Sequence, residues 1–328
     1  MRDSRAIPLW PAGGTRQRPT VRALVLPAMM LAMVACFAVM APDFLSFRNM
    51  QNIMVQASYI AVFACAQMIV LVVRGLDLSL GHTVSTVSVL YALVAVGGGF
   101  AEVLGPSQTL AVAAALTVAV LAGLFNGLCV AYLNVNAFVV TLASMNVLLG
   151  VASMLSDGHP VGGVPDTFST IFYSGSLLGI PAPLAWGAGV LLVLHFGLTN
   201  MRVGRGLYII GSNPRAAVLA GLAEKRLIMF AYVACSVIGA IGALMLTART
   251  GSGEPNLGGN ITLQSIAAAA IGGVSLRGGA GGVLAALLGA LFITILSNGM
   301  NFMQINGYIQ QIALGLVIVA AVSFDRRD

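Results

Sequence analysis

Residue types that catalyse reactions are scarce in this chain, and only one short stretch brings several of them together. The stretch "SDGHP" contains Ser156, Asp157 and His159, which are the residue types of a hydrolytic triad. A triad is assembled from side chains that meet in space around a substrate, and adjacent residues of one loop do not provide that arrangement. The sequence therefore predicts no catalytic residues and a protein that is not an enzyme.

Two further features argue against a metal centre and a nucleotide site. All four cysteines lie inside apolar runs, and none of them shows C-x-x-C spacing. Cysteines of this kind are typical small hydrophobic residues that pack in a protein interior. The glycine-rich stretch "GGVSLRGGAGG" (272–282) lacks the lysine that ends a G-x-x-x-x-G-K-[ST] phosphate loop. Its glycines favour close helix packing and a tight turn. We expect no metal ion and no bound cofactor.

Asp77 is the acidic residue closest to the interior of an apolar run. An ionisable group within a membrane is a functional hypothesis by default. Asp77 nevertheless directly precedes an apolar run and follows Arg74. We therefore expect a structural role, in which Asp77 caps the following helix and pairs with Arg74.

The polar residues inside the apolar runs are almost all neutral amides and hydroxyls. Such groups either bond neighbouring helices to one another or line a path for an uncharged, hydroxyl-rich solute. Ion-coupled transport usually places carboxylates in the middle of the membrane, and their absence here argues against it. The candidate path residues are Gln67, Asn126, Asn146, Gln264 and Asn298.

The elements that position these residues must lie in a membrane. The 328 residues are 59% hydrophobic and 8% charged, with a mean hydropathy of +0.96. Soluble domains carry about 25% charged residues. The apolar runs are continuous rather than alternating, which indicates spanning helices of roughly 20 residues instead of a transmembrane barrel. The net charge of +6 lacks the interleaved basic and aromatic surface of a nucleic-acid-binding protein.

The apolar runs predict an all-α polytopic membrane protein with about ten transmembrane helices. The expected domain organisation is a cytoplasmic tail at 1–22, a transmembrane domain at 23–323 and a cytoplasmic tail at 324–328. The eighth run is short enough for a broken or tilted helix. The expected spans are 23–41, 52–73, 79–97, 108–131, 136–155, 181–199, 227–247, 262–276, 280–298 and 307–323.

Loop charge sets the orientation of such a protein, because Lys and Arg accumulate on the cytoplasmic side. With the N-terminus inside, all sixteen basic residues except Arg48 and Arg249 fall in cytoplasmic segments. Ten spans place both chain ends on one side. We therefore expect both termini in the cytoplasm.

The largest internal cytoplasmic loop, at about 200–226, predicts a short helix. Asn213 can cap its start, Pro214 suits its first turn, and Gly221 suits a left-handed C-terminal cap. A helix this short needs a packing partner to be stable. It either lies on the protein's own membrane face or docks into a separate cytoplasmic protein.

Five stretches together resemble the permease subunit of sugar-type ABC importers, the ribose, xylose, arabinose and autoinducer-2 group. The resemblance extends over about 47–322. The stretches are "VRGLDLSLG" (73–81), "NAFVVTLASM" (136–145), "GRGLYIIGSNPRAAVLAGL" (204–222), "SIAAAAIGGVSLRGGAGG" (265–282) and "LSNGMNFMQINGYIQQIALGLVIVAAV" (296–322).

The resemblance implies a type II ABC importer-like fold in the bacterial inner membrane and a coupling element that docks into an ATPase. Two features depart from the family pattern. Arg215 stands where the family usually has Glu, and 260–266 lacks an acidic residue often found there. The coupling residues implied are Asn213, Pro214, Arg215, Ala216, Ala217 and Gly221.

The resemblance also implies the partners: two cytoplasmic ABC ATPase domains, an extracytoplasmic sugar-binding protein and a second permease copy or a paralogue. Membrane lipid surrounds the subunit, and no nucleic acid is expected. The function expected is ATP-driven import of a sugar or a related polyhydroxy compound. The alternative is an ion-coupled secondary transporter of a small neutral solute.

Overall fold

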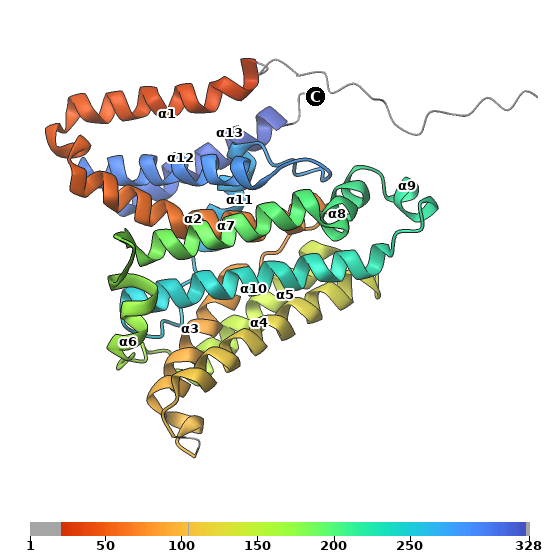
Figure 1. The fold of residues 1–328 in the computed structure, drawn as a ribbon, viewed down its shortest axis with the longest axis horizontal. Helices are drawn as coiled ribbons and strands as arrows, with labels where there is room; N and C mark the ends of the chain where they lie inside the picture. Colours follow the sequence, from red (N-terminus) through yellow and green to blue (C-terminus); the bar gives the residue numbers. More distant parts are fainter. Residues whose placement is uncertain (1–20, 104, 326–328) are drawn as a thin grey trace, which may run out of the picture.

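The computed structural model describes residues 21–103 and 105–325, and this part of the chain is almost entirely helical (Figure 1). Most of the two expected tails, 1–20 and 326–328, lies outside the described residues. The α-helices are α1 (Val21–Met40), α2 (Phe47–Val72), α3 (Leu80–Val96), α4 (Gln108–Ala131), α5 (Ala137–Leu155), α6 (Asp166–Ser169), α7 (Ala182–Asn200), α8 (Arg202–Ser212), α9 (Pro214–Leu219), α10 (Glu224–Thr250), α11 (Ile261–Gly272), α12 (Val283–Phe302) and α13 (Gly307–Asp325).

Each of the ten apolar ranges expected to span the membrane is occupied by one of these helices. Within the described residues, six are long and apolar enough to cross a membrane: α2, α4, α5, α7, α10 and α12. The apolar parts of α1, α3, α11 and α13 are shorter. The expected eighth range, 262–276, was too long at its C-terminal end. Helix α11 stops at Gly272 because Gly273 has a φ of +99° and forms a left-handed cap.

Helix α2 forms the centre of the bundle, and most of its residues are buried. It packs against α7, α10, α11 and α12. Helix α10 packs along α4 through small residues. Cβ atoms added at Gly123 or Gly127 of α4 would meet the backbone of α10 at closer than normal contact distance. Small residues of this kind allow helices to approach closely inside a membrane, where packing and not the hydrophobic effect holds them together.

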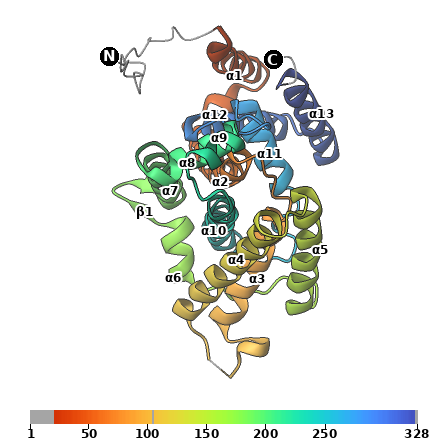
Figure 2. The ribbon, with the colours of Figure 1, turned by 90° about the vertical axis from the view of Figure 1, so that its right-hand side faces the viewer.

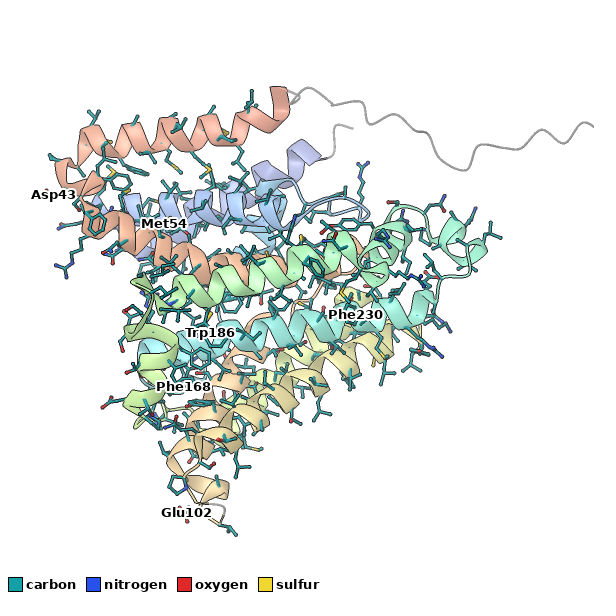
Figure 3. The ribbon with its side chains drawn as sticks, in the orientation of Figure 1. Asp43, Met54, Glu102, Phe168, Trp186 and Phe230 are labelled. Carbon is teal, nitrogen blue, oxygen red and sulfur yellow. The ribbon has the colours of Figure 1, made fainter. Side chains whose placement is uncertain are left out.

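Short elements close the end of the bundle at which α2 and α7 begin. They are the 3₁₀ helices at Pro42–Leu45 and Gly99–Ala101, the π-helix at Thr170–Ser174, and the antiparallel strands β1 (Ser176–Leu177) and β2 (Ile180–Pro181). A row of rings fixes this end: Tyr91 stacks on Phe168 at 4.0 Å between centroids, and Phe172 stacks on Trp186 at 4.7 Å. Figure 3 shows Phe168 and Trp186 on this side of the molecule.

The opposite end carries α8 and α9, on the right in Figure 1. Helix α8 was not expected from the sequence, which suggested a loop there. Its residues Gly204, Leu207, Ile210 and Gly211 are buried, whereas Arg202 and Arg205 are exposed. The helix is therefore amphipathic and lies with one face on the bundle. The first turn of α1 and the C-terminal end of α13 lie at this same end of the molecule (Figure 1).

Candidate coupling and translocation sites

Helix α9 has the capping geometry that the sequence predicts. The Asn213 side-chain oxygen accepts a hydrogen bond from the Ala216 backbone N–H at 3.1 Å, and Pro214 occupies the first turn. Gly221 follows with a φ of +74°, and the Leu222 N–H donates to the Ala217 carbonyl at 3.0 Å. These contacts satisfy both ends of a helix of only six residues.

The two faces of α9 differ in what they contact. Ala217 is completely buried against the protein's own helices. Arg215 and Ala216 are exposed, as are 57% of Val218 and 89% of Leu219. Ala217 therefore anchors α9 to the bundle, and the exposed surface of α9 is formed by Arg215, Ala216, Val218 and Leu219.

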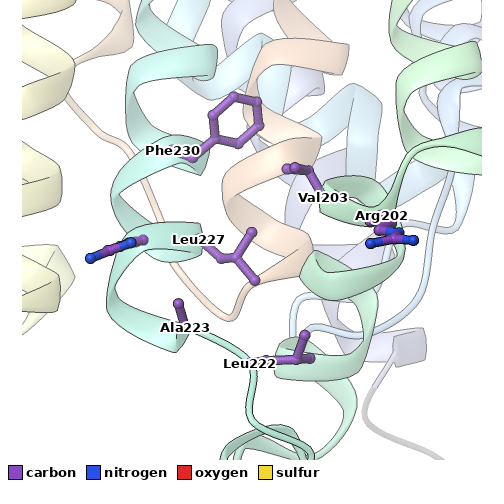
Figure 4. A pocket seen from close by; sticks show the side chains of 7 residues that line it. Arg202, Val203, Leu222, Ala223, Leu227 and Phe230 are labelled. Carbon is purple, nitrogen blue, oxygen red and sulfur yellow. The ribbon is translucent and has the colours of Figure 1, made fainter.

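A cavity of about 360 Å³ lies beside α9, between the first turns of α8 and α10. Apolar side chains form most of its wall, and Arg202 lies at its edge (Figure 4). The lining residues are Arg202, Val203, Leu222, Ala223, Arg226, Leu227 and Phe230. Leu222 and Ala223, which connect α9 to α10, contribute one wall of the cavity.

The C-terminal end of α8, directly before α9, is fastened to the end of α2 by Arg74. The Arg74 Nε donates to the Gly211 carbonyl at 2.6 Å, and its Nη2 donates to the Ser212 carbonyl at 2.9 Å. These carbonyls lie in the last turn of α8, where no intrahelical donor is available and a cation is favourable. Arg74 itself has a φ of +64°, a strained value for a residue other than glycine.

The loop 273–282 also contacts the ends of α2 and α8 at this place. The Gly279 N–H donates to the Val72 carbonyl at 2.8 Å, and the Tyr208 hydroxyl donates to the Gly281 carbonyl at 3.0 Å. Burial raises the pKa of Tyr208, so this hydroxyl keeps its proton and remains a donor. A side chain at Gly211 would collide with the Val72 carbonyl. We call this three-way contact of α2, α8 and loop 273–282 the inner joint.

The expected pairing of Asp77 with Arg74 is wrong, because the Arg74 guanidinium donates its hydrogen bonds to carbonyls of α8. The Asp77 Oδ1 instead accepts from the backbone N–H of Ser79 at 2.9 Å and from its hydroxyl at 2.6 Å. Asp77 is completely buried. The carboxylate thus orders the turn that leads into α3. The expected capping role is also wrong, because Ser79 is the N-cap of α3 and no side chain among the described residues caps that helix.

Three of the five candidate path residues are used for bonds between elements. The Gln67 amide contacts the backbone N–H and C=O of Asp77, both at 3.1 Å. Asn126 donates to the Ser79 hydroxyl at 2.8 Å and accepts from Ser144. Asn298 exchanges two amide hydrogen bonds with Asn49, at 3.0 and 3.1 Å. All three side chains are buried, so this arrangement of the subunit leaves them no surface for a solute.

The remaining two candidates lie on an open side of the bundle. Asn146 is exposed on α5 and donates only to the Leu142 carbonyl of its own helix. Gln264 is half-buried in the first turn of α11. Figure 2 shows α5, α11 and α13 along one side of the molecule. The structure therefore separates the candidate set into three buried structural residues and two residues that remain at least partly accessible.

Helices α3 and α11 both begin inside the bundle, where their N-terminal ends meet. The Gly81 N–H donates to the Thr262 hydroxyl at 2.9 Å, and that hydroxyl donates to the Leu78 carbonyl at 3.3 Å. A side chain at Gly81 would collide with the Gly258 carbonyl, and one at Gly258 would collide with the Gly81 carbonyl. The first turn of α3 and the non-helical segment 251–260 therefore cross at Gly81 and Gly258, and we call this contact the glycine crossing.

Sequence reasoning missed the segment 251–260, which was assigned to an outer loop. The segment instead runs back along α3. Its Gly253 packs against Ser88 and Val89, and its Gly258 N–H donates to the Ser85 hydroxyl at 3.0 Å. The shortness of the eighth apolar run was a usable signal, since it was consistent with a broken or a tilted helix.

Comparison with known proteins agrees with this architecture. Residues 49–322 match the family described as "Branched-chain amino acid transport system / permease component". The ribose import permease protein RbsC of Haemophilus influenzae is 33% identical over 300 residues, which cover 90% of each chain. The D-allose transport system permease protein AlsC of Escherichia coli is 31% identical and covers 89% of this chain and 88% of its own. The L-arabinose transport system permease protein AraH of Escherichia coli is 33% identical, with 89% and 87% covered. Since the family match extends over most of the chain, this protein belongs to the family of ABC-transporter permease components.

Proposed function

We propose that this chain is the membrane-spanning permease subunit of an ATP-driven ABC importer for a sugar or a related polyhydroxy compound. ATP is hydrolysed by a separate ATPase subunit, and α9 docks into that subunit. The observation that carries this proposal is the inner joint, which connects α9 through α8 to the ends of α2 and of loop 273–282. Movement imposed on α9 is thereby passed to the central helix of the bundle.

The substrate class rests on chemistry and on the relatives. The open side of the bundle carries amide side chains, which suit a hydroxyl-rich, uncharged solute. The similar permeases are named for ribose, D-allose and L-arabinose. A neutral monosaccharide-like compound fits both observations.

The assembly and the orientation belong to the same proposal. We infer that all ten apolar helices cross the inner membrane and that both termini are cytoplasmic. In support, the start of α1 and the end of α13 lie on the side of α8 and α9 (Figure 1). A second permease copy or a paralogue covers the open side of α5 and α13, two ATPase domains bind at the α9 end, and a sugar-binding protein docks at the opposite end. The exposed apolar side chains include Phe138, Val139, Val147 and Met154 on α5, and Tyr308, Ile309, Ile312 and Leu316 on α13.

One observation favours a second candidate, the ion-coupled secondary transporter. Half-helices that meet inside the membrane, as α3 and α11 do, are typical of secondary transporters, which place coupling-ion sites there. The two acids near the glycine crossing are already used by neighbouring residues: the Asp77 Oδ1 accepts two hydrogen bonds from Ser79, and the Glu254 Oε1 accepts one from Ser252. No group of three or more His, Cys, Asp or Glu that could hold a metal ion occurs among residues 21–103 and 105–325.

Uptake measurements distinguish the two candidates. In cells that express the permease with its ATPase and binding protein, a protonophore should leave radiolabelled sugar uptake largely intact while ATP is maintained. A substitution in the Walker A lysine of the ATPase should abolish uptake, because ATP hydrolysis is the only energy source of an ABC importer. Uptake that collapses with the proton gradient and survives the ATPase substitution would establish the secondary transporter instead.

A further inference from the structure

The segment 251–260 lies deep within the bundle, although it follows the outer end of α10. Helix α11 continues from it for 12 residues, or about 18 Å, before the inner joint is reached. On the other side, Gly81 at the glycine crossing lies about 22 Å along α3 from its last residue, Val96. The hydrocarbon core is about 30 Å thick. The crossing therefore lies near the middle of the membrane.

Part of this segment is exposed at that depth. Asn256, Gly259 and Asn260 are exposed, whereas Pro255 and Gly258 are buried. Irregular backbone does not face lipid in the hydrocarbon region, since its unpaired N–H and C=O groups would cost several kcal/mol each. Such backbone is tolerated only where protein buries it or where it lines water.

We propose that residues 256–260 line the aqueous translocation path and that the Asn256 and Asn260 side chains bind hydroxyl groups of the passing solute. This inference rests on the proposed function for the solute's identity, and on the position of the segment for the path itself. The site is a polar patch at the mid-membrane N-terminal end of α11, extended by Gln264 one turn further along.

The chemistry of the patch fits an uncharged polyhydroxy compound. Within the described chain, the side chains of Asn256, Asn260 and Gln264 make no hydrogen bond, so three amides are free to donate and accept. The nearby carboxylate of Glu254 accepts from the Ser252 hydroxyl at 2.6 Å. Asp77 is completely buried behind the crossing. Amides that both donate and accept match sugar hydroxyls, which also do both.

The position of the patch also fits a path shared by two subunits. Helix α11 packs on α3, α12 and α13, and α3 packs on α5. Figure 2 shows α11, which begins directly after 256–260, between α13 and α5 along one side of the molecule. A second permease copy on this side would enclose the patch and leave a polar channel between the subunits.

Cysteine accessibility tests the path directly. Asn256→Cys and Asn260→Cys are introduced singly after the four native cysteines are replaced by Ala or Ser. The assembled transporter, with its ATPase, is treated in membranes with a charged methanethiosulfonate reagent from both faces. The matched control is Leu192→Cys, because Leu192 is 69% exposed in the middle of α7, a helix long and apolar enough to cross a membrane.

Both asparagine-derived cysteines should react at least about tenfold faster than Leu192→Cys, since a charged reagent reaches only water-lined positions. Saturating sugar should slow the reaction. Reaction no faster than that of Leu192→Cys would overturn the inference and would place the segment in a dry contact between subunits. Neither result depends on whether ATP drives the transport.

Uptake kinetics test the binding role. Asn260→Ala and Asn256→Ala should each raise the KM for sugar uptake by about five- to tenfold, because one hydrogen bond to the solute is lost. Asn260→Ser should retain part of the affinity. The control Asn200→Ala removes an exposed amide at the end of α7 and should leave KM unchanged. An unchanged KM for both patch variants, alongside normal ATP-driven uptake, would overturn the binding role while the proposed function stands.

Discussion

The inner joint and the segment 251–260 both depend on closely packed glycines, yet their polar side chains are used in opposite ways. At the inner joint, Arg74 donates to two carbonyls of α8, and Gly279 and Tyr208 donate to two further carbonyls. In the segment, the side chains of Asn256 and Asn260 face outward and make no hydrogen bond within the described chain. The polar side chains of the inner joint are thus hydrogen-bonded to other elements, whereas the amides of Asn256 and Asn260 can still bind another molecule.

This difference separates two tasks of a transporter. A connection that passes movement from a docking helix to the membrane helices must be stiff, and satisfied hydrogen bonds in a tight contact make it so. A path for solute must offer unsatisfied groups that a solute can use briefly. Glycine serves both regions, because it allows close approach of backbones at the inner joint and at the glycine crossing.

The largest effect should follow from filling the glycine crossing. Gly81→Ala introduces a methyl group that collides with the Gly258 carbonyl, and neither backbone can move away within the packed bundle. We expect loss of the folded subunit, measured as a strong decrease in detergent-stable protein by fluorescence-detected size-exclusion chromatography. Gly150→Ala in α5 meets no atom within 4 Å and should leave stability unchanged. A stable Gly81→Ala protein would show that the two segments are not in close contact.

The second effect should follow from releasing the inner joint. Arg74→Gly removes the guanidinium and suits the backbone φ of +64° better than arginine does, so any defect comes from the lost bonds to α8. We expect the ATPase to co-purify normally, whereas sugar uptake per ATP hydrolysed should fall by about tenfold or more, because movement of α9 no longer reaches α2.

Two controls sharpen this test. Arg74→Lys keeps the charge and loses the two-carbonyl geometry, so it should retain an intermediate ratio of uptake to hydrolysis. Arg277→Ala removes an exposed cation of loop 273–282 whose side chain is not part of the inner joint, and should leave the ratio unchanged. If Arg74→Gly keeps the normal ratio, the inner joint has only a structural role.

The smallest effect should follow from a charge change on the exposed face of α9. Arg215→Glu places an anion in the first turn, which favours the helix, so weaker docking would report on contacts with the ATPase alone. An exposed ion pair contributes roughly 0–1 kcal/mol, so retention of the ATPase should weaken by about fivefold at most. Titration of the purified ATPase against the reconstituted permease measures this. Unchanged or tighter binding would show that Arg215 does not meet an acidic group.

Ala217 illustrates where sequence reasoning reached its limit at α9. Asn213, Pro214 and Gly221 predicted the start and the end of the helix, because caps are local hydrogen-bond patterns. The family resemblance implied that Ala216 and Ala217 both belong to the coupling element. Which alanine faces the bundle depends on the orientation of the preceding helix α8, and only the tertiary structure shows that Ala217 is buried.

Hydropathy determined the ten apolar helices and the membrane location, since long apolar runs have no other stable environment. Five motifs determined the family. The tertiary structure decided how the polar residues are used, because Gln67, Asn126 and Asn298 find partners more than nine residues away in sequence, on other elements. It also decided that residues 251–260 turn back into the bundle. Apolar periodicity carries no signal for an extended glycine-rich segment, and the position of that segment follows from its contacts with α3 and from the bridge between Gly253 and Val161.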